Sequence, residues 1–284
     1  MDIYVEVEPN VKIYVNDMFP GGFKTLLFIH GWPASQEMFE YQYNQLVPLG
    51  YRCIGMDVRG FGKSDKPLTG YSYNQLADDL LKVIQTLNLH NVTLIGHSTG
   101  GAIALRYLAR HNSYRVTNLV LAAAAAPSLI QRPNFPYGQQ AEAIEKNFIL
   151  TTLQDRPKML WDFGKIFFYK PVSQPFSDWF FSLGLQAASW STLAISKAWL
   201  SETLFADLTN IHIPTLILHG IHDQVVPYEL GLIQNQSIPD SKLVTFEDSG
   251  HGLFFDERHR FNQEIIQFLE QQQNINLNQT HNLN

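Results

Sequence analysis

Residues 92–101 of this chain read Val-Thr-Leu-Ile-Gly-His-Ser-Thr-Gly-Gly, and this stretch decides the fold. Residues 92–95 are apolar or β-branched and predict a buried strand, whereas residues 101–109 are rich in helix-forming side chains. The pattern Gly-x-Ser-x-Gly between them predicts a tight strand-to-helix turn with Ser98 at its apex, because glycines prevent collision between strand and helix. The hydroxyl would then lie at a helix N-terminus, where free N–H groups favour a developing negative charge.

The chain on either side of this turn alternates between apolar runs and amphipathic stretches. Apolar runs predict further parallel strands at residues 25–29, 52–56, 119–121, 214–219 and 242–246, and an alternating run at 11–15 suits an edge or hairpin strand. Apolar residues at helical spacing predict helices at residues 37–49, 73–87, 228–236 and 258–271. This order predicts an α/β fold, in which a mainly parallel, twisted sheet carries helices on both faces. Active sites of such sheets form at the carboxyl ends of the strands.

The alternation stops between residues 127 and 208. This segment is rich in aromatic side chains and has no clear parallel-strand signal, so we predict a helical cap inserted into the sheet domain. The α/β core then comprises residues 1–126 and 209–272. Seven of the twelve residues 273–284 are Gln or Asn, a composition that does not build a core, and they predict a disordered tail.

Composition narrows the possible partners. The chain has 284 residues and a formal net charge of −6, which argues against nucleic acid or an anionic membrane surface as its main partner. Cys53 is the single cysteine, so no disulfide can form within the chain. The first residues lack the pattern of a secretory signal, and no apolar run approaches the length of a membrane span. We therefore expect a cytoplasmic protein.

A serine hydroxyl needs a base to remove its proton, and that base must be oriented by a third group. His251 is the candidate base, because it lies between two glycines directly after the last predicted strand. Asp223 is the candidate acid, because it follows the strand that ends at His219. None of the competing histidines has this position after the last strand: His212, His219, His222, His259 and His281.

Each of these three residues also has a plainer interpretation. Ser98 would then belong to a glycine-rich turn before an ordinary helix, His251 to an exposed loop, and Asp223 to a loop or a helix cap. The flanking strands and the chain order of serine, acid and histidine favour the catalytic interpretation.

An oxyanion needs two preorganised N–H donors. The backbone N–H of Thr99, which follows the serine, is the first candidate. The second is the backbone N–H of Trp32, which lies in the loop after an early strand. The Trp32 side chain remains free to act as a packing aromatic, because only its backbone is needed.

Two other chemistries find little support in the pattern. His219, His222 and Asp223 lie close in sequence, but no regular ligand spacing to other histidines accompanies them, so we predict no metal site. No Gly-x-Gly-x-x-Gly follows the first strand, so we predict no dinucleotide and no other cofactor.

Five motifs together resemble the α/β-hydrolase superfamily. They are His-Gly-Trp-Pro at 30–33, Asp-Val-Arg-Gly-Phe-Gly-Lys-Ser-Asp at 57–65, Gly-His-Ser-Thr-Gly-Gly at 96–101, Gly-Ile-His-Asp at 220–223 and Gly-His-Gly at 250–252. Within it, the chain is similar to the aryl-esterase and cofactor-free haloperoxidase (perhydrolase) branch. That branch has similar loops, a Gly-Gly after the serine, and an Ala-Arg-His like residues 109–111.

The resemblance implies a serine hydrolase that acts on small hydrophobic or aromatic carboxylic esters through an acyl-enzyme. A proline like Pro33 is associated with peracid formation from hydrogen peroxide in that branch, so perhydrolase side activity is possible here. The superfamily places its acid in one of two positions, and residues 122–127, at the other position, offer no carboxylate. Two positions depart from the branch, since Thr99 replaces a common methionine and Gly250 a usual proline.

Several alternatives stay open. Haloalkane dehalogenases and epoxide hydrolases are excluded, because they carry an aspartate at the position of Ser98. Carbon–carbon bond hydrolases and lactonases share the Ser-His-Asp set. A non-enzymatic ligand receptor on this fold and a cofactor-free dioxygenase or lyase are further alternatives. The expected partner is a small-molecule ester, with no nucleic acid or membrane, and the oligomeric state does not follow from the sequence.

Overall fold

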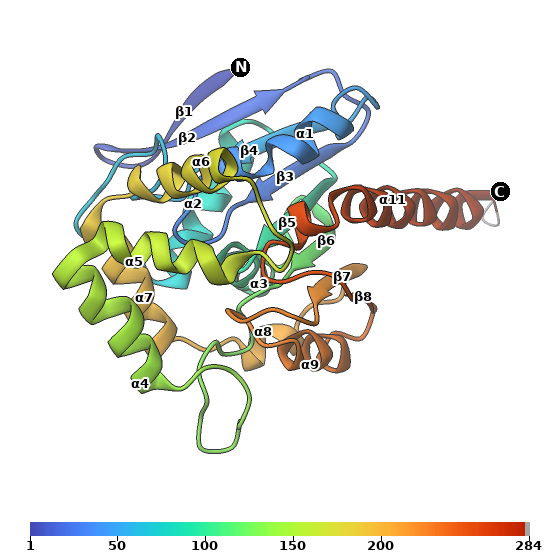
Figure 1. The fold of residues 1–284 in the computed structure, drawn as a ribbon. Coiled ribbons are helices and arrows are strands. Elements are labelled where there is room, and N and C mark those ends of the chain that lie inside the picture. The colour runs from blue at the N-terminus through green and yellow to red at the C-terminus, as the bar shows by residue number, and fades with distance from the viewer. Residues whose placement is uncertain (282–284) are drawn as a thin grey trace.

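The computed structural model describes residues 1–281 and shows a central sheet surrounded by helices (Figure 1). Its strands are β1 (Asp2–Glu8), β2 (Val11–Met18), β3 (Thr25–Ile29), β4 (Arg52–Met56), β5 (Val92–His97), β6 (Val116–Ala122), β7 (Thr215–Gly220) and β8 (Ser241–Phe246). They lie in the order β1-β2-β4-β3-β5-β6-β7-β8. Strand β2 pairs antiparallel with β1 and β4, and all other neighbours are parallel. The predicted mainly parallel sheet is therefore confirmed.

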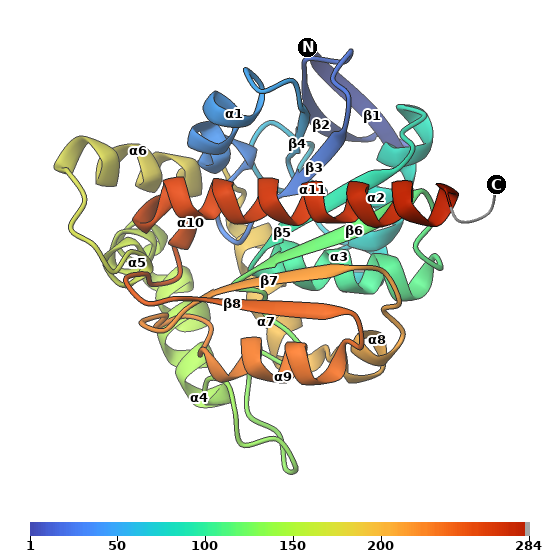
Figure 2. The same ribbon diagram turned by 90° about the vertical axis from the view of Figure 1, so that its right-hand side faces the viewer.

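Helices cover both faces of this sheet. The core helices are α1 (Glu40–Leu46), which follows the 3₁₀ turn η1 (Gln36–Phe39), and α2 (Tyr73–Thr86), α3 (Thr99–Arg110), α9 (Glu229–Ser237), α10 (Leu253–Asp256) and α11 (Arg258–His281). Figure 2 shows α11 crossing in front of the sheet, with α2 and α3 behind it. Every residue of β5 and of β7 is buried, which explains why these strands read as uninterrupted apolar runs.

The chain between β6 and β7 forms helices. They are α4 (Ala141–Ile144), the π-helical turn η2 (Glu145–Leu150), α5 (Thr151–Phe167), α6 (Gln174–Leu185), α7 (Ser189–Ser201) and α8 (Phe205–Thr209). Figure 1 shows α4, α5 and α7 packed together on one side of the sheet. We keep the name cap for residues 127–208, whose exact boundaries remain a prediction.

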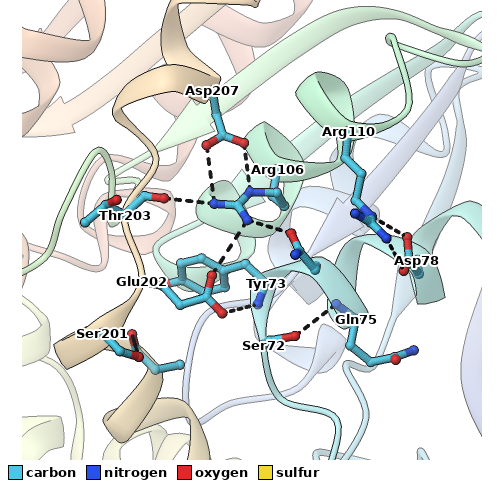
Figure 3. A network of polar contacts seen from close by, with 12 residues as sticks. Ser72, Tyr73, Gln75, Asp78, Arg106, Arg110, Ser201, Glu202, Thr203 and Asp207 are labelled. Carbon is cyan, nitrogen blue, oxygen red and sulfur yellow. Dashed lines mark hydrogen bonds and ion pairs between the residues drawn. The ribbon is translucent and has the colours of Figure 1, made fainter.

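An arginine on the core helix α3 ties the cap to the core (Figure 3). Arg106 pairs with Asp207 at 2.8 Å, donates to the carbonyl of Thr203 at 2.8 Å, and reaches the side chain of Asn74 on α2 at 2.6 Å. Glu202, the residue after α7, accepts a hydrogen bond of 2.8 Å from the N–H of Tyr73. Together these contacts hold the chain after α7 against two core helices, α2 and α3, and α3 begins just after Ser98.

Two ends of the chain differ from the sequence-based expectation. Strand β1 was not predicted, because only Val5 and Val7 are buried in an otherwise polar edge strand. At the other end, α11 continues through residues 273–281, where a disordered tail was expected; residues 282–284 lie outside the described residues. The helical backbone continues there from earlier turns of α11, whose residues Phe261, Ile265 and Leu269 are buried in the core, and adding residues to a formed helix is easier than starting one. None of the helices among residues 1–281 is both long enough and apolar enough to span a bilayer.

Candidate active site

Ser98 occupies the tight turn that its flanking glycines predict. It lies between β5 and α3 with φ of 54° and ψ of −120°, a left-handed conformation that is rare for a residue with a side chain. A Cβ atom at Gly96 would lie 2.6 Å from the Gly100 carbonyl oxygen, and one at Gly100 would lie 2.2 Å from the Ile29 carbonyl oxygen. Among the described residues, the Ser98 hydroxyl makes no capping hydrogen bond to α3. The backbone therefore presents this hydroxyl free at the helix N-terminus.

Asp223 and His251 come together at the carboxyl ends of β7 and β8. The Nδ1–H of His251 donates a hydrogen bond of 2.8 Å to Oδ2 of Asp223, and both side chains are fully buried. The other carboxylate oxygen accepts the N–H groups of Val225 and Val226, each at 2.8 Å. Burial alone would raise the pKa of Asp223, but attraction to His251 when that ring is protonated, and hydrogen bonds from His219 and His251, hold the pKa below its usual range. Asp223 is therefore ionised at neutral pH.

The second nitrogen of His251 is available for proton transfer. A carboxylate only accepts hydrogen bonds, so Nδ1 carries the ring proton and Nε2 carries the lone pair of the neutral imidazole. Nε2 is buried and has no hydrogen-bond partner within residues 1–281. Nδ1 of His97 and Nδ1 of His219 are also buried without a partner within these residues, so it is the hydrogen bond to Asp223 that distinguishes His251 from its two neighbours.

Two further histidines, which the sequence analysis did not assign to the site, surround this pair. His97 donates from Nε2 to the carbonyl of His251 at 2.9 Å, and their rings lie 4.6 Å apart. We call residues 247–252, the loop between β8 and α10 that carries His251, the histidine loop. Because His97 directly precedes Ser98, its contact with His251 brings the serine turn alongside this loop. Burial and the neighbouring His251 lower the pKa of His97 well below its usual range, so it stays neutral. Nε2 of His219 lies 3.5 Å from Asp223 Oδ2 and donates a hydrogen bond of 2.9 Å to the carbonyl of Val226.

Ser98 opens onto a cavity of about 560 Å³ between the core and the cap. Its apolar lining comes mainly from the cap, and its aromatic members are Trp32, Phe148, Phe163 and Trp199. The charged side chains of Asp155, Lys158 and Asp162 also line it. Other cap aromatics, such as Phe167 and Phe180, pack in the core instead. The volume suits a small-molecule ligand with an apolar portion.

Trp32, in the loop after β3, lines this cavity, and Thr99 is the first residue of α3, directly after Ser98. The indole N–H of Trp32 donates to the carbonyl of Thr192 at 3.1 Å, and the indole of Trp199 donates to Thr99 Oγ1 at 3.1 Å. Both side chains are thus engaged in packing against α7. Their backbone N–H groups as oxyanion donors stay a prediction.

The three residues weighed as a metal site have different partners in the fold. His222 stacks on Tyr169 with ring centroids 3.8 Å apart, whereas His219 is buried with its Nε2 3.5 Å from Asp223 Oδ2. In the part of the chain that the structure describes, no three His, Cys, Asp or Glu side chains are grouped to hold a metal ion.

Comparisons with known proteins agree on one family. A family model described as the α/β hydrolase fold matches residues 24–258. The AB hydrolase superfamily protein YisY of Bacillus subtilis (strain 168) is 44% identical over 268 residues, covering 94% of this chain and 99% of that protein. The non-heme chloroperoxidase CPO-A1 of Kitasatospora aureofaciens is 33% identical over 269 residues, covering 91% and 96%. An esterase from Exiguobacterium antarcticum, EaEST, has a solved structure with a TM-score of 0.92 and 44% identity, covering 95% and 100%.

The chain therefore belongs to the α/β-hydrolase family. The resemblance to esterases and cofactor-free haloperoxidases that its motifs carry is confirmed by these relatives. Membership of this family and the esterase relative support hydrolysis of small-molecule esters as its reaction.

Proposed function

We propose that this protein is a serine esterase that cleaves small hydrophobic or aromatic carboxylic esters through an acyl-enzyme. One observation carries the proposal. His251 donates from Nδ1 to Asp223 at 2.8 Å, while its Nε2 is buried without a partner in the described chain. This is the arrangement that a general base needs beside a nucleophile.

In the proposed reaction, Ser98 Oγ attacks the ester carbonyl carbon while His251 Nε2 takes its proton. The backbone N–H groups of Trp32 and Thr99 stabilise the oxyanion. The tetrahedral intermediate collapses, and His251 returns the proton to the departing alcohol. Water then attacks the acyl-enzyme, gives its proton to His251, and the carboxylic acid leaves as Ser98 is regenerated. Asp223 orients the imidazole and stabilises its protonated form throughout.

Hydrolysis of p-nitrophenyl esters from acetate to octanoate tests the proposal. We expect kcat of Ser98→Ala to fall by on the order of 10⁴-fold or more, because the triad acts as a unit. Ser182→Ala, at an exposed position on α6, is the matched control and should keep wild-type turnover. A fluorophosphonate that labels wild type at Ser98 alone would support the covalent step. Folded Ser98→Ala with near-wild-type turnover would refute it.

The acid has its own test. Asp223→Asn keeps the shape of the side chain but lets it donate to His251 Nδ1, which favours the wrong tautomer. We expect kcat to fall by on the order of 10³- to 10⁴-fold. Unchanged kcat would mean that another carboxylate, or none, orients His251.

Perhydrolysis is the second candidate function, favoured by the similarity to a non-heme chloroperoxidase. In that reaction hydrogen peroxide attacks the acyl-enzyme in place of water and a peracid leaves. Peracid formation from acetate and hydrogen peroxide, absent in Ser98→Ala, would demonstrate it. A carbon–carbon hydrolase, a lactonase or a receptor becomes the better assignment if the folded wild type shows no multiple turnover on any ester.

A further inference from the structure

Asp256 is a buried carboxylate outside the proposed triad, at the end of the short helix α10. It accepts three backbone hydrogen bonds. One comes from the N–H of Gly250 at 2.9 Å, next to His251, and two come from the N–H groups of Tyr169 and Lys170 at 3.0 and 3.1 Å. Gly250 belongs to the histidine loop, whereas Tyr169 and Lys170 belong to the cap. The Asp256 carboxylate therefore joins the histidine loop to the cap.

The cap residues held in this way form the connection between α5 and α6. We call residues 167–170 the buttress segment. Figure 2 shows that α10 lies beside the end of α5, where this segment begins. The carbonyl of Phe167 accepts the N–H of Gly252 at 2.8 Å, and the Phe167 ring packs edge-on against the His251 imidazole with centroids 4.9 Å apart. The buttress segment thus contacts the residues on both sides of His251, and His251 itself.

The two glycines beside His251 allow this close approach. A Cβ atom at Gly252 would lie 2.3 Å from the Phe168 ring, and one at Gly250 would lie 3.0 Å from the backbone nitrogen of Tyr169. Gly250 also supplies an N–H that a proline at this position would lack. Glycines on both sides of His251 therefore leave room for the buttress segment to pack against the histidine loop.

The buttress segment also reaches the loop of the proposed acid. Tyr169 stacks on His222, the residue before Asp223, with the ring planes 10° apart. The N–H of His222 in turn donates to the carbonyl of Ser249 in the histidine loop at 3.1 Å. The acid loop and the base loop are thus fastened to the same four cap residues.

We propose that Asp256 is a positioning residue that fixes the buttress segment against the histidine loop, so that the alignment of His251 depends on the cap. The inference rests on the proposed function, in which His251 is the general base. Reaction rates are sensitive to such alignment, since a displacement of about 1 Å can cost about 100-fold. Asp256 touches no reacting atom and acts only through the backbone that it holds.

Asp256→Asn is the direct test, because an amide has one acceptor oxygen and its NH₂ group faces an N–H donor. With p-nitrophenyl acetate we expect kcat to fall by roughly 10- to 100-fold and KM to stay within about threefold. The low-field proton NMR signal of the His251 Nδ1–H should broaden or shift. Asp256→Glu, which keeps both oxygens and the charge, should recover much of the lost kcat.

Glu257→Gln is the matched control. Glu257 accepts from Ser249 Oγ at 2.7 Å and from the N–H of Asp248 at 3.1 Å, so it holds the same loop with no hydrogen bond to the cap among the described residues. We expect its kcat within about threefold of wild type and an unchanged low-field signal. An equal loss of kcat in both variants would overturn the inference, as would wild-type kcat and an unchanged signal in Asp256→Asn.

Two additions keep the outcome decisive. If Asp256→Asn does not fold, Gly250→Pro replaces it, measured against Gly250→Ala, because both variants add a Cβ near the Tyr169 nitrogen but only proline removes the N–H donor. A lower kcat for Gly250→Pro than for Gly250→Ala at constant KM supports the inference, and an equal kcat for the two overturns it. His251→Ala is measured in the same assay. Turnover in His251→Ala would refute the proposed function, whereas an inactive His251→Ala beside a normal Asp256→Asn would refute only the positioning role.

Discussion

The indole N–H of Trp199, on the cap helix α7, donates a hydrogen bond of 3.1 Å to the side-chain oxygen of Thr99, the first residue of α3. The same indole packs edge-on against Trp32 with ring centroids 4.9 Å apart. The side chains of both residues proposed as oxyanion donors are therefore in contact with one cap residue. The cap is thus fastened to the core beside the Ser98 turn, where the proposed reaction would develop negative charge.

Thr99→Val should lower stability by removing the acceptor of the hydrogen bond from the Trp199 indole. Valine matches threonine in shape, but it leaves the buried indole N–H of Trp199 without an acceptor, which costs about 1–3 kcal/mol. We expect the free energy of unfolding in urea to fall by that amount and the preferred acyl-chain length to broaden as the indole loses its anchor. Thr99→Ser, which keeps the acceptor, should lie closer to wild type. Equal losses in both variants would contradict the interpretation.

Arg106→Met should weaken the attachment of the cap to the core. It leaves the mostly buried carboxylate of Asp207 and the carbonyl of Thr203 without their partner, so we expect a loss of about 2–4 kcal/mol in the free energy of unfolding. Arg110→Ala, in the same view of Figure 3, is the control. Arg110 pairs with Asp78 at a largely exposed site, so its loss should stay below about 1 kcal/mol. Equal losses in the free energy of unfolding for Arg106→Met and Arg110→Ala would show that Arg106 does not hold the cap on the core.

Asp57 should make stability depend on pH. Burial raises its pKa to about 6 from the ordinary 3.8, although the N–H groups of Gln36 and Lys63 each donate to it at 2.8 Å. Between these pKa values the folded state holds a proton that the unfolded state has lost. The free energy of unfolding therefore falls as pH rises through this window, by about 2–3 kcal/mol.

Asp57→Asn removes this titration along with some hydrogen bonding, so only the pH dependence of the difference is informative. We expect the stability of wild type relative to Asp57→Asn to decline between about pH 4 and pH 6. Urea denaturation at half-unit intervals measures it. A difference that is constant over this range would mean that Asp57 ionises in the folded protein as it does in water.

Gly100→Ala and Gly164→Ala should have opposite effects. A Cβ at Gly100 would meet the Ile29 carbonyl oxygen at 2.2 Å, so α3 and the end of β3 would have to separate. We expect a loss of more than about 3 kcal/mol or failure to fold. Nothing lies within 4 Å of a Cβ at Gly164 in α5, so alanine there should stabilise the protein by about 0.5–1 kcal/mol. Thermal unfolding of both variants checks the contrast, and a tolerated Gly100→Ala would contradict it.

The sequence by itself determined the sheet except for the edge strand β1, and it determined the order of the proposed site residues along the chain. Apolar runs such as residues 92–95 fix strands, and the glycine spacing around Ser98 fixes the turn, because these signals depend on neighbours only a few residues apart. The same local rules placed Asp223 and His251 after strands, and parallel strands bring their carboxyl ends to one edge. The Asp223–His251 pair could therefore be predicted from local patterns alone, because each residue directly follows a parallel strand.

Only the tertiary structure decided what surrounds that pair. His97 meets His251 across 154 positions of sequence, Trp199 meets Thr99 across 100, and Asp256 meets Tyr169 across 87. A buried carboxylate and an exposed one look alike in a sequence, since the difference lies in which backbone N–H groups the folded chain brings to them. Long-range hydrogen bonds have no period and no local motif, so their partners are defined only once the cap has packed on the core.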